Sequence, residues 1–561
     1  MMLNNKRLCI IQMPSEDPLL GSIGTKLPPL SLGILAGYLR SHGLEVDLVD
    51  LIPRVTEIFS QEDINDFQQF YEKEIVYQYV KGIENKYFDN FVLRMLEEIP
   101  MEDYDIIGIS VGPHLSWVQT FCGLIFGAYI KNNYKKKLIF GGFNLTTMAN
   151  YQPTYDELFY LINKELGYII LGPGEKVLYE LVNEIRGEED QDLIHKLEGI
   201  CYINSKDKLK CNPSANRLIV MPNFDGLKLS DYYNYIKKDA YEETMVALFR
   251  YPFAFTKKLI TPKQGEYEPY LIIPYIFNYN CPYNCSFCVE SDPDSPKPVI
   301  GTVEQVIADI KRLKEKYHTP YFYFINNAIN LSKKFVREFC EAFQKENITI
   351  YWSDCARFDH TDMDLLKLMY DSGCRKLVFG MESGSKEMVK RINKKIDLEY
   401  ASQILEWCSE IGIWAELEII FGMPTENEEY FNESYEYIKK NLHNISFFTT
   451  NHYIPMPGSV MFRTPQEFGI EITQKANFEE ILHIDLELLK NGKNPVNYNN
   501  PMKLYHYKEI HGRSASQIHT DTLERIKKAQ KLLNGKLIQE MVKYMGMGYI
   551  SMNDLQVIGL K

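Results

Sequence analysis

The sequence predicts an α/β protein in which strands and helices alternate through two successive regions, with a mainly helical C-terminal region after them. Short apolar runs at 7–12 and 105–111 are typical of buried strands, and the segments that follow them carry apolar residues at helical spacing. The helical segment 31–43 ends at Gly43, a common terminating residue. Such alternation forms parallel sheets, whose ligands bind outside the carboxyl ends of the strands.

The first region, residues 1–200, is expected to form a Rossmann-like, doubly wound sheet. Its remaining strands are predicted at 44–50, 137–143 and 167–175, and its remaining main helices at 115–131 and 176–187. Residues 54–103 are expected to be helical, acidic additions without clear chemistry. Small residues stand near the ends of these strands, where they would let a flat ligand approach the backbone. They are Ser110, Gly141, Gly142 and Gly172.

The second region, residues 270–462, is predicted to contain six strand–helix units arranged as a partial barrel. Active groups of such barrels lie at the carboxyl ends of the strands. Between the two regions, residues 201–269 are expected to be an irregular linker with short helices, and residues 463–561 a helical C-terminal domain. The six strands are expected at 273–280, 321–326, 348–358, 376–385, 413–424 and 444–459.

Composition narrows the class of protein. The chain has 561 residues, 45% hydrophobic and 24% charged, which is typical of a globular protein. The net charge of −13 argues against non-specific binding to nucleic acid or to an anionic membrane. No signal peptide or membrane-spanning apolar run is found, so a cytoplasmic protein is expected. Most of the eleven cysteines, such as Cys340, Cys374 and Cys408, are expected to be buried free thiols in a reducing compartment.

Three cysteines directly follow the first strand of the second region. Cys281, Cys285 and Cys288 have the spacing Cys-x3-Cys-x2-Cys. Three thiolates can hold three irons of a 4Fe–4S cluster and leave the fourth iron open to another ligand. A structural zinc site usually has four ligands in paired sets, and no fourth cysteine or histidine lies nearby. The alternatives are three free cysteines or a partial zinc site.

The run CPYNCSFC, with the aromatic Phe287 before the third cysteine, resembles the signature of radical S-adenosylmethionine (SAM) enzymes. The resemblance implies that the open iron chelates the amino and carboxylate groups of SAM. It also implies that one electron from the cluster cleaves SAM to methionine and a 5′-deoxyadenosyl radical. An external electron donor, flavodoxin or ferredoxin, is implied as a partner.

Later segments of the second region are similar to SAM-binding loops of the same family. GMESGS implies that Glu382 and Ser383 contact SAM, with a helix N-cap at Ser383 or Ser385 as the alternative. WSDCAR implies that Arg357 pairs with the SAM carboxylate, and an ion pair with Asp359 or Asp362 is its alternative. FGMP resembles a turn that passes near the adenine, with a simple turn as the alternative.

The run after the second strand departs from the family, which often has an acidic residue there. This chain has Asn326, whose amide could bind the methionine amino group without a charge. Glu418 and Tyr453 are the candidates for proton or radical chemistry. Strand alternation directs Glu418 into the barrel, where a carboxylate needs a partner. Tyr453 could relay a proton or quench a radical, and buried packing is its alternative.

The order of segments before the cysteines is similar to the cobalamin-binding domain of one subgroup of radical SAM enzymes. The similar segments are PPLSLGILAGYLRSHG with LEVDLVD, the GIS run, a strand ending in Gly-Gly, and LGPGE. The resemblance implies that Ser110, Gly141, Gly142 and Gly172 lie against cobalamin. Residues 13–29 contain no histidine, so cobalt is expected to lack a histidine lower ligand. His114 is expected to make a surface or helix-end contact instead.

Together these resemblances imply a cobalamin-dependent radical SAM enzyme that acts on a small molecule or peptide. The expected reaction is methylation of an unactivated carbon through the 5′-deoxyadenosyl radical and methylcobalamin. One alternative is a cobalamin-dependent rearrangement, cyclisation or ring formation without methyl transfer. A second is a non-catalytic sensor that binds a cluster or cobalamin. The sequence does not name the substrate.

Overall fold

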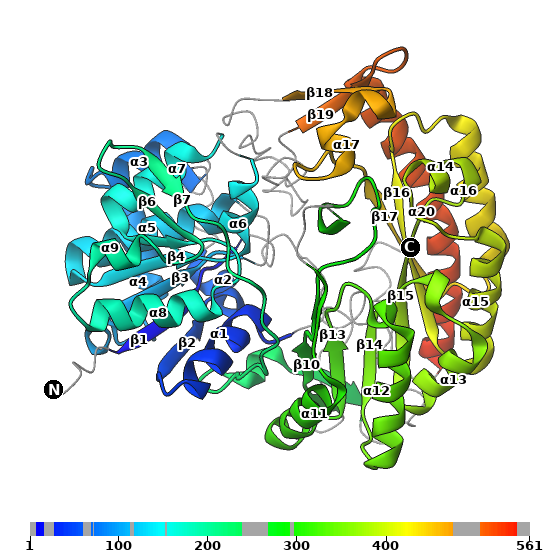
Figure 1. Ribbon diagram of the computed structural model, residues 1–561, viewed down its shortest axis with the longest axis horizontal. Helices are drawn as coiled ribbons and strands as arrows, with labels where there is room; N and C mark the ends of the chain where they lie inside the picture. The colour runs from blue at the N-terminus through cyan, green and yellow to red at the C-terminus, as the bar shows by residue number, and fades with distance from the viewer. Residues whose placement is uncertain are drawn as a thin grey trace. The chain divides into compact units, whose positions relative to one another are not determined.

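The computed structural model divides into two compact units, each described here by itself (Figure 1). The first includes the N-terminal strand and continues to Lys228, past the boundary expected at residue 200. The second begins at Leu229 and includes the chain from His506 onward, so the expected C-terminal helical domain belongs to the barrel unit. The structure describes residues 7–15, 27–59, 69–70, 72–112, 117–151, 154–237, 267–291, 297–474 and 505–546.

The first unit contains a seven-stranded sheet in the order β2-β1-β3-β4-β5-β6-β7. The first five strands in sequence run parallel, which confirms the predicted doubly wound sheet. They are β1 (Leu8–Gln12), β2 (Val46–Asp50), β3 (Ile106–Ser110), β4 (Lys137–Gly141) and β5 (Tyr168–Ile170). Two antiparallel strands, β6 (Ile200–Ile203) and β7 (Leu209–Cys211), extend it from residues expected to be linker.

Helices cover both faces of this sheet because successive strand residues point to opposite sides. Leu8 and Ile10 of β1 pack with α1 (Leu30–Ser41) and α8 (Glu175–Arg186). Cys9 and Ile11 of the same strand belong to the core of the other face. The helices of that face are α3 (Lys73–Val80), α4 (Lys86–Leu96), α5 (Trp117–Tyr134), α6 (Phe143–Ala149) and α7 (Asp156–Leu161).

Cys201 and Cys211 lie opposite each other in the antiparallel pair of β6 and β7 and form a disulfide. This pair is an exception to the expectation of free thiols, which holds for the other cysteines. The hairpin joins residues that are ten positions apart, and only the strand register brings them together.

The second unit contains a six-stranded parallel sheet in the order β10-β13-β14-β15-β16-β17, as predicted for a partial barrel. Helices lie outside the strands (Figure 1). The strands are β10 (Ile272–Tyr275), β13 (Tyr321–Phe324), β14 (Tyr351–Ala356), β15 (Cys374–Glu382), β16 (Trp414–Phe421) and β17 (Phe447–His452). The main helices are α11 (Val303–Tyr317), α12 (Lys333–Lys345), α13 (Met363–Asp371), α15 (Leu398–Ile411) and α16 (Glu428–Asn441).

The chain after β17 does not continue the strand–helix alternation. A short helix, α17 (Val460–Arg463), leads to a two-stranded sheet of β18 (Ile470–Gln474) and β19 (Tyr505–Glu509). The long helix α20 (Ala515–Gly546) then packs against β16, β17 and α16. Among the described residues, no helix has both the length and the apolar character needed to cross a bilayer.

We predict that Gly142→Ala lowers the thermal midpoint of the protein more than Gly43→Ala does. Both glycines have positive φ, 115° for Gly142 and 77° for Gly43, and left-handed backbone costs a non-glycine residue about 1–2 kcal/mol. A Cβ on Gly142 would also lie 2.4 Å from the carbonyl oxygen of Val111, whereas nothing lies within 4 Å of one on Gly43. Equal midpoints in thermal denaturation would contradict this close approach.

Candidate functional site

The cysteine loop, residues 281–288, follows β10 and the two-residue strand β11 (Asn278–Tyr279), at the carboxyl end of the barrel sheet. All three cysteines are free; Cys285 is buried, and Cys281 and Cys288 are partly exposed. Burial raises the pKa of Cys281, and the positive charges of Arg357 and Lys394 act in the opposite direction. The loop therefore offers three thiols with two cations near them.

The three thiols lie on one short loop and are its only metal-binding side chains. Each thiolate of a 4Fe–4S cluster binds a different iron atom, whereas a structural zinc site usually has four ligands. This donor set therefore fits the expected 4Fe–4S cluster. Within the described part of the chain, no group of three or more Cys, His, Asp or Glu side chains is arranged to hold a metal ion.

Two other segments of the same unit hold the cysteine loop in place. The Ser286 N–H donates to the Ile392 carbonyl at 3.0 Å, and the Ser286 carbonyl accepts from the N–H of Met461 in α17 at 2.8 Å. The Asn393 side-chain amide donates to the Asn284 carbonyl at 2.7 Å. These bonds fix the backbone on both sides of Cys285, so the spacing of the thiols depends on tertiary contacts.

Arg357 lies just beyond β14 and is 8% exposed. Its Nε donates to Asp359 at 2.8 Å, and its Nη2 donates to the Lys394 carbonyl at 3.1 Å. The guanidinium carbon lies 3.6 Å from the ring centroid of Tyr283 in the cysteine loop. The alternative of an ion pair with Asp359 is thus present, in a buried setting, and contact with a SAM carboxylate stays a prediction.

Glu382 ends β15 in a left-handed conformation, with φ of 65°, where the register to β16 shifts. Its Oε1 accepts from Lys394 Nζ at 2.8 Å, and both side chains are largely buried. A Cβ on Gly380 would lie 2.6 Å from that oxygen, so the glycine leaves room for the ion pair. The sequence did not indicate a role for Lys394, because no local pattern shows that it pairs with Glu382.

The pKa of Lys394 is raised although burial, the largest influence on it, acts to lower the value. The charge of Glu382, its hydrogen bond to Lys394 and the charge of Cys285 together outweigh the burial. Lys394 therefore stays a cation between the carboxylate and the cysteine loop. Such a cation would favour an anionic cluster or a carboxylate bound beside it.

Ser383 and Asn326, both predicted to contact SAM, bind other parts of the protein. The Ser383 hydroxyl shares a hydrogen bond with the Ser434 hydroxyl at 3.0 Å. Ser385, rather than Ser383, precedes helix α14 (Lys386–Arg391), and it makes no side-chain cap. The Asn326 Oδ1 accepts from the N–H groups of Phe277 and Asn278 at 2.9 Å each. Asn326 thereby anchors the segment that leads into the cysteine loop.

The inner face of the barrel sheet, opposite the helices, carries a row of charged side chains. Lys376 and Glu416 form an ion pair at 2.5 Å, with side chains 2% and 5% exposed. Glu418 follows on the same face and accepts from the Asn451 amide at 2.8 Å. Burial raises the pKa of Glu418, and the charges of Glu416 and Glu382 raise it further. A polar ligand bound inside the barrel would contact these charged side chains.

Tyr453 follows β17 and is 3% exposed. Its ring packs against Tyr507 with centroids 5.6 Å apart, in an apolar cluster that also includes Phe287 of the cysteine loop. The Tyr453 hydroxyl has no hydrogen-bond partner within the described part of the chain, and burial raises its pKa. Its placement matches the buried-packing alternative, and a role in proton or radical transfer stays a prediction.

The small residues predicted for the first unit gather at the carboxyl edge of its sheet. Ser110 pairs in register with Gly141, and its hydroxyl donates to Gln12 Oε1 at 3.2 Å. Gly142 and Gly172 follow the next strands with φ of 115° and 83°. Small residues therefore stand at the ends of these strands, and the exposed ring of Phe143 directly follows Gly142. His114 lies outside the described residues.

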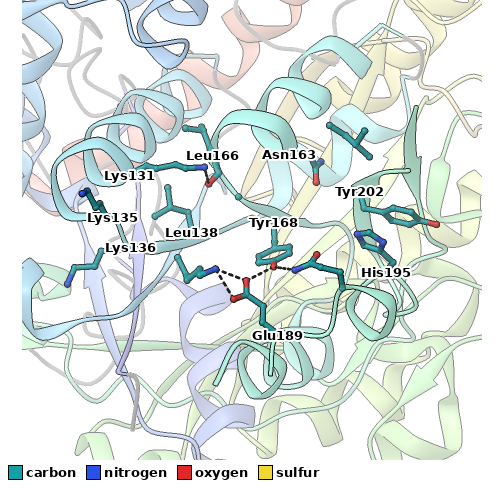
Figure 2. A pocket seen from close by; sticks show the side chains of 14 residues that line it. Lys131, Lys135, Lys136, Leu138, Asn163, Leu166, Tyr168, Glu189, His195 and Tyr202 are labelled. Atoms are coloured by element: carbon teal, nitrogen blue, oxygen red, sulfur yellow. Dashed lines mark hydrogen bonds and ion pairs between the residues drawn. The ribbon is translucent and has the colours of Figure 1, made fainter. Parts of the chain in front are cut away.

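A groove of 520 Å³ lies at the opposite, amino edge of the same sheet (Figure 2). Lys137 there pairs with Glu189 at 2.7 Å, and Tyr168 donates to the same carboxylate at 2.8 Å. Lys131 lies in the last turn of α5 and Lys135 directly after it, where cations offset the negative end of the helix dipole. The ion pair with Glu189 and the end of α5 account for these charges, so the groove is not the candidate site.

Part of the barrel unit matches a known protein family. Residues 275–438 match the model of the Radical SAM superfamily. This segment is therefore similar to radical SAM domains. The chain around it resembles cobalamin-dependent radical SAM methyltransferases, as the sequence motifs predicted.

Three relatives illustrate the resemblance. The chain is 20% identical to cytidylyl-2-hydroxyethylphosphonate methyltransferase of Streptomyces wedmorensis over 463 residues, 78% of this chain and 77% of the relative. It is 26% identical to anaerobic magnesium-protoporphyrin IX monomethyl ester cyclase of Rubrivivax gelatinosus over 238 residues, 39% and 41% of the two chains. The methyltransferase TsrM of Kitasatospora setae, solved with cobalamin and a [4Fe-4S] cluster, is 14% identical, with a TM-score of 0.55 and 93% and 91% of the chains covered. The likeness to TsrM confirms the predicted fold.

We predict that Asp354→Asn changes how stability depends on pH. Asp354 is buried and accepts from the Asn326 amide at 2.6 Å, and burial raises its pKa from 3.8 to about 7. The folded protein therefore binds more protons than the unfolded chain between these values, so this group's contribution to the free energy of unfolding falls as pH rises from 3.8 to about 7. Urea denaturation across that range should show a shallower fall for the variant, and parallel curves would contradict the assignment.

Proposed function

We propose that this chain is a cobalamin-dependent radical SAM enzyme that methylates an unactivated carbon atom of a small molecule or peptide. The observation that carries the proposal is the cysteine loop at the carboxyl end of a parallel barrel sheet, within a segment that matches the Radical SAM superfamily. A separate doubly wound unit with small residues at its carboxyl edge supports the cobalamin part.

Cys281, Cys285 and Cys288 would hold the cluster, and Lys394 and Arg357 would face it as cations. Ser110, Gly141, Gly142 and Gly172 would lie against cobalamin, with no histidine from residues 13–29 below the cobalt. When bound, these groups supply a 5′-deoxyadenosyl radical that removes a hydrogen atom and a methyl group that replaces it. An external electron donor, flavodoxin or ferredoxin, would reduce the cluster.

The chain's own residues would bind and orient the substrate. Lys376 and Glu416 supply fixed charges on the inner face of the barrel. Burying an ion pair costs desolvation free energy, and a role in substrate specificity would explain why this pair is kept. Glu418, with its raised pKa, would accept a hydrogen bond or a proton from a polar group of the substrate. Tyr453, in the apolar cluster that includes Phe287, would relay a proton or quench a radical. The reaction needs positioning of the radical, the carbon and the methyl donor.

A second candidate is ring formation or rearrangement without methyl transfer. The similarity to the Rubrivivax gelatinosus cyclase favours it, because that relative is not named as a methyltransferase. The two candidates would use the same cluster and SAM, and they differ in whether a second SAM molecule donates a methyl group. A sensor that only binds its cofactors would cleave no SAM.

Changing Cys281, Cys285 and Cys288 together to Ala should abolish the cluster and the formation of 5′-deoxyadenosine, because no other thiol in the loop can replace them. Iron and sulfide analysis after anaerobic reconstitution, with chromatography of the reduced protein plus SAM, measures both. Wild-type protein should hold about four irons.

Cys408→Ala is the matched control, because it removes a buried free thiol from helix α15, outside the cysteine loop. This variant should keep the iron and the SAM cleavage of wild-type protein. Full iron content in the triple variant would refute the cluster assignment. Iron without 5′-deoxyadenosine in the wild-type protein would instead favour the sensor.

By-products should separate methylation from rearrangement. Methyl transfer through the proposed route should release one 5′-deoxyadenosine and one S-adenosylhomocysteine for each methylated product, because SAM serves two purposes. Rearrangement should release 5′-deoxyadenosine without stoichiometric S-adenosylhomocysteine. Deuterium placed at the reacting carbon should appear in 5′-deoxyadenosine. If methylation proceeds while no deuterium appears in 5′-deoxyadenosine, the hydrogen leaves by another route, methyl transfer is polar and the radical step is excluded.

A further inference from the structure

Tyr283, in the middle of the cysteine loop, is held by two side chains that follow β14. The Arg357 guanidinium lies over its ring, with 3.6 Å between the guanidinium carbon and the ring centroid. The Tyr283 hydroxyl shares a hydrogen bond with Nε2 of His360. Since Tyr283 stands between Cys281 and Cys285, these contacts act directly on the backbone that carries two of the three thiols.

Arg357 is itself held firmly, so its charge has a defined position. Asp359 accepts from its Nε and Nη2 at 2.8 and 3.3 Å, and the Lys394 carbonyl accepts from Nη2 at 3.1 Å. Its stacking on the ring of Tyr283 is a favourable cation–π contact in a largely desolvated setting. The guanidinium cannot move from the cysteine loop without breaking all of these contacts.

The same guanidinium acts electrostatically on the thiols. Its charge is held over the ring of Tyr283, which lies two residues from both Cys281 and Cys285. A fixed positive charge next to a group that gains an electron stabilises the reduced state. The contacts of Arg357 therefore have an electronic consequence as well as a mechanical one.

We propose that Tyr283 is a positioning residue for the iron–sulfur cluster, which orients the cysteine loop and keeps the Arg357 charge beside the cluster. This inference rests on the proposed function, because it requires a cluster at the three cysteines. It assigns Arg357 a role through Tyr283 that differs from binding the SAM carboxylate. The Arg357 charge makes the cluster easier to reduce, and the stacked ring keeps the charge in place.

The test compares anaerobically reconstituted variants without SAM, so that SAM binding does not enter the result. Tyr283→Leu removes the ring and the hydroxyl, Tyr283→Phe removes only the hydroxyl, and Arg357→Met removes the charge. Arg375→Met is the matched control, since Arg375 lies 4.1 Å over the ring of Tyr370, where β15 begins rather than beside the cysteines. The readouts are the midpoint potential from a redox titration followed by EPR, and the rate of iron release to a chelator.

Tyr283→Leu and Arg357→Met should both shift the midpoint potential to more negative values. Both should also release iron faster, by about tenfold, as is typical when a group that supports metal ligands is lost. Tyr283→Phe should keep a potential near that of wild-type protein, because the ring under the guanidinium remains. Arg375→Met should match wild-type protein in both readouts.

A wild-type potential in Arg357→Met, or an equal shift in Arg375→Met, would overturn the inference while leaving the proposed function intact. Absence of a cluster in wild-type protein would overturn the proposed function and the inference with it. If Tyr283→Leu fails to fold, as judged by circular dichroism, the comparison of Arg357→Met with Arg375→Met still decides the electronic part. Tyr283→Phe then tests the part played by the hydroxyl. A shift of its midpoint potential to more negative values would overturn the claim that the ring alone keeps the Arg357 charge in place.

Discussion

The backbone hydrogen bonds of Ser286 are the constraint on which the proposed chemistry depends. Its N–H donates to Ile392 at the end of α14 and its carbonyl accepts from Met461 in α17, so two distant segments set the path of the chain between Cys285 and Cys288. Three thiols can share one cluster only if their backbone is held at a defined separation. The barrel therefore contributes the shape of the site, and the cysteines contribute its ligands.

Charge is distributed unevenly around this loop. Lys394 and Arg357 lie beside the thiols, each with its own carboxylate partner, Glu382 or Asp359. Buried pairs of this kind gain little net stability, because the desolvation of both charges offsets their attraction. Their use is better explained by the fixed positive charge that they hold next to the loop. Gly380 serves the same end, since any side chain there would displace the Glu382–Lys394 pair.

In the first unit, the candidate surface is the carboxyl edge of the sheet, where small residues leave the backbone accessible. Parallel register sets Ser110 beside Gly141. Gly142 approaches the Val111 carbonyl so closely that a Cβ would clash. A broad, flat ligand needs such an edge, because projecting side chains would hold it away from the sheet. The lysines at the amino edge have a separate explanation in the helix end that they neutralise.

The parallel strands of both sheets, the cysteine spacing and the family resemblance could be read from the sequence alone, because periodicity and short motifs are local properties. The antiparallel strands β6 and β7 could not, because they lie in residues expected to be linker. The tertiary structure alone decided which side chains meet. It paired Cys201 with Cys211, Glu382 with Lys394, and Arg357 with Asp359 and Tyr283. It also turned Asn326 toward backbone and Asp354. These outcomes depend on strand register and loop contacts between distant residues, which no local pattern encodes.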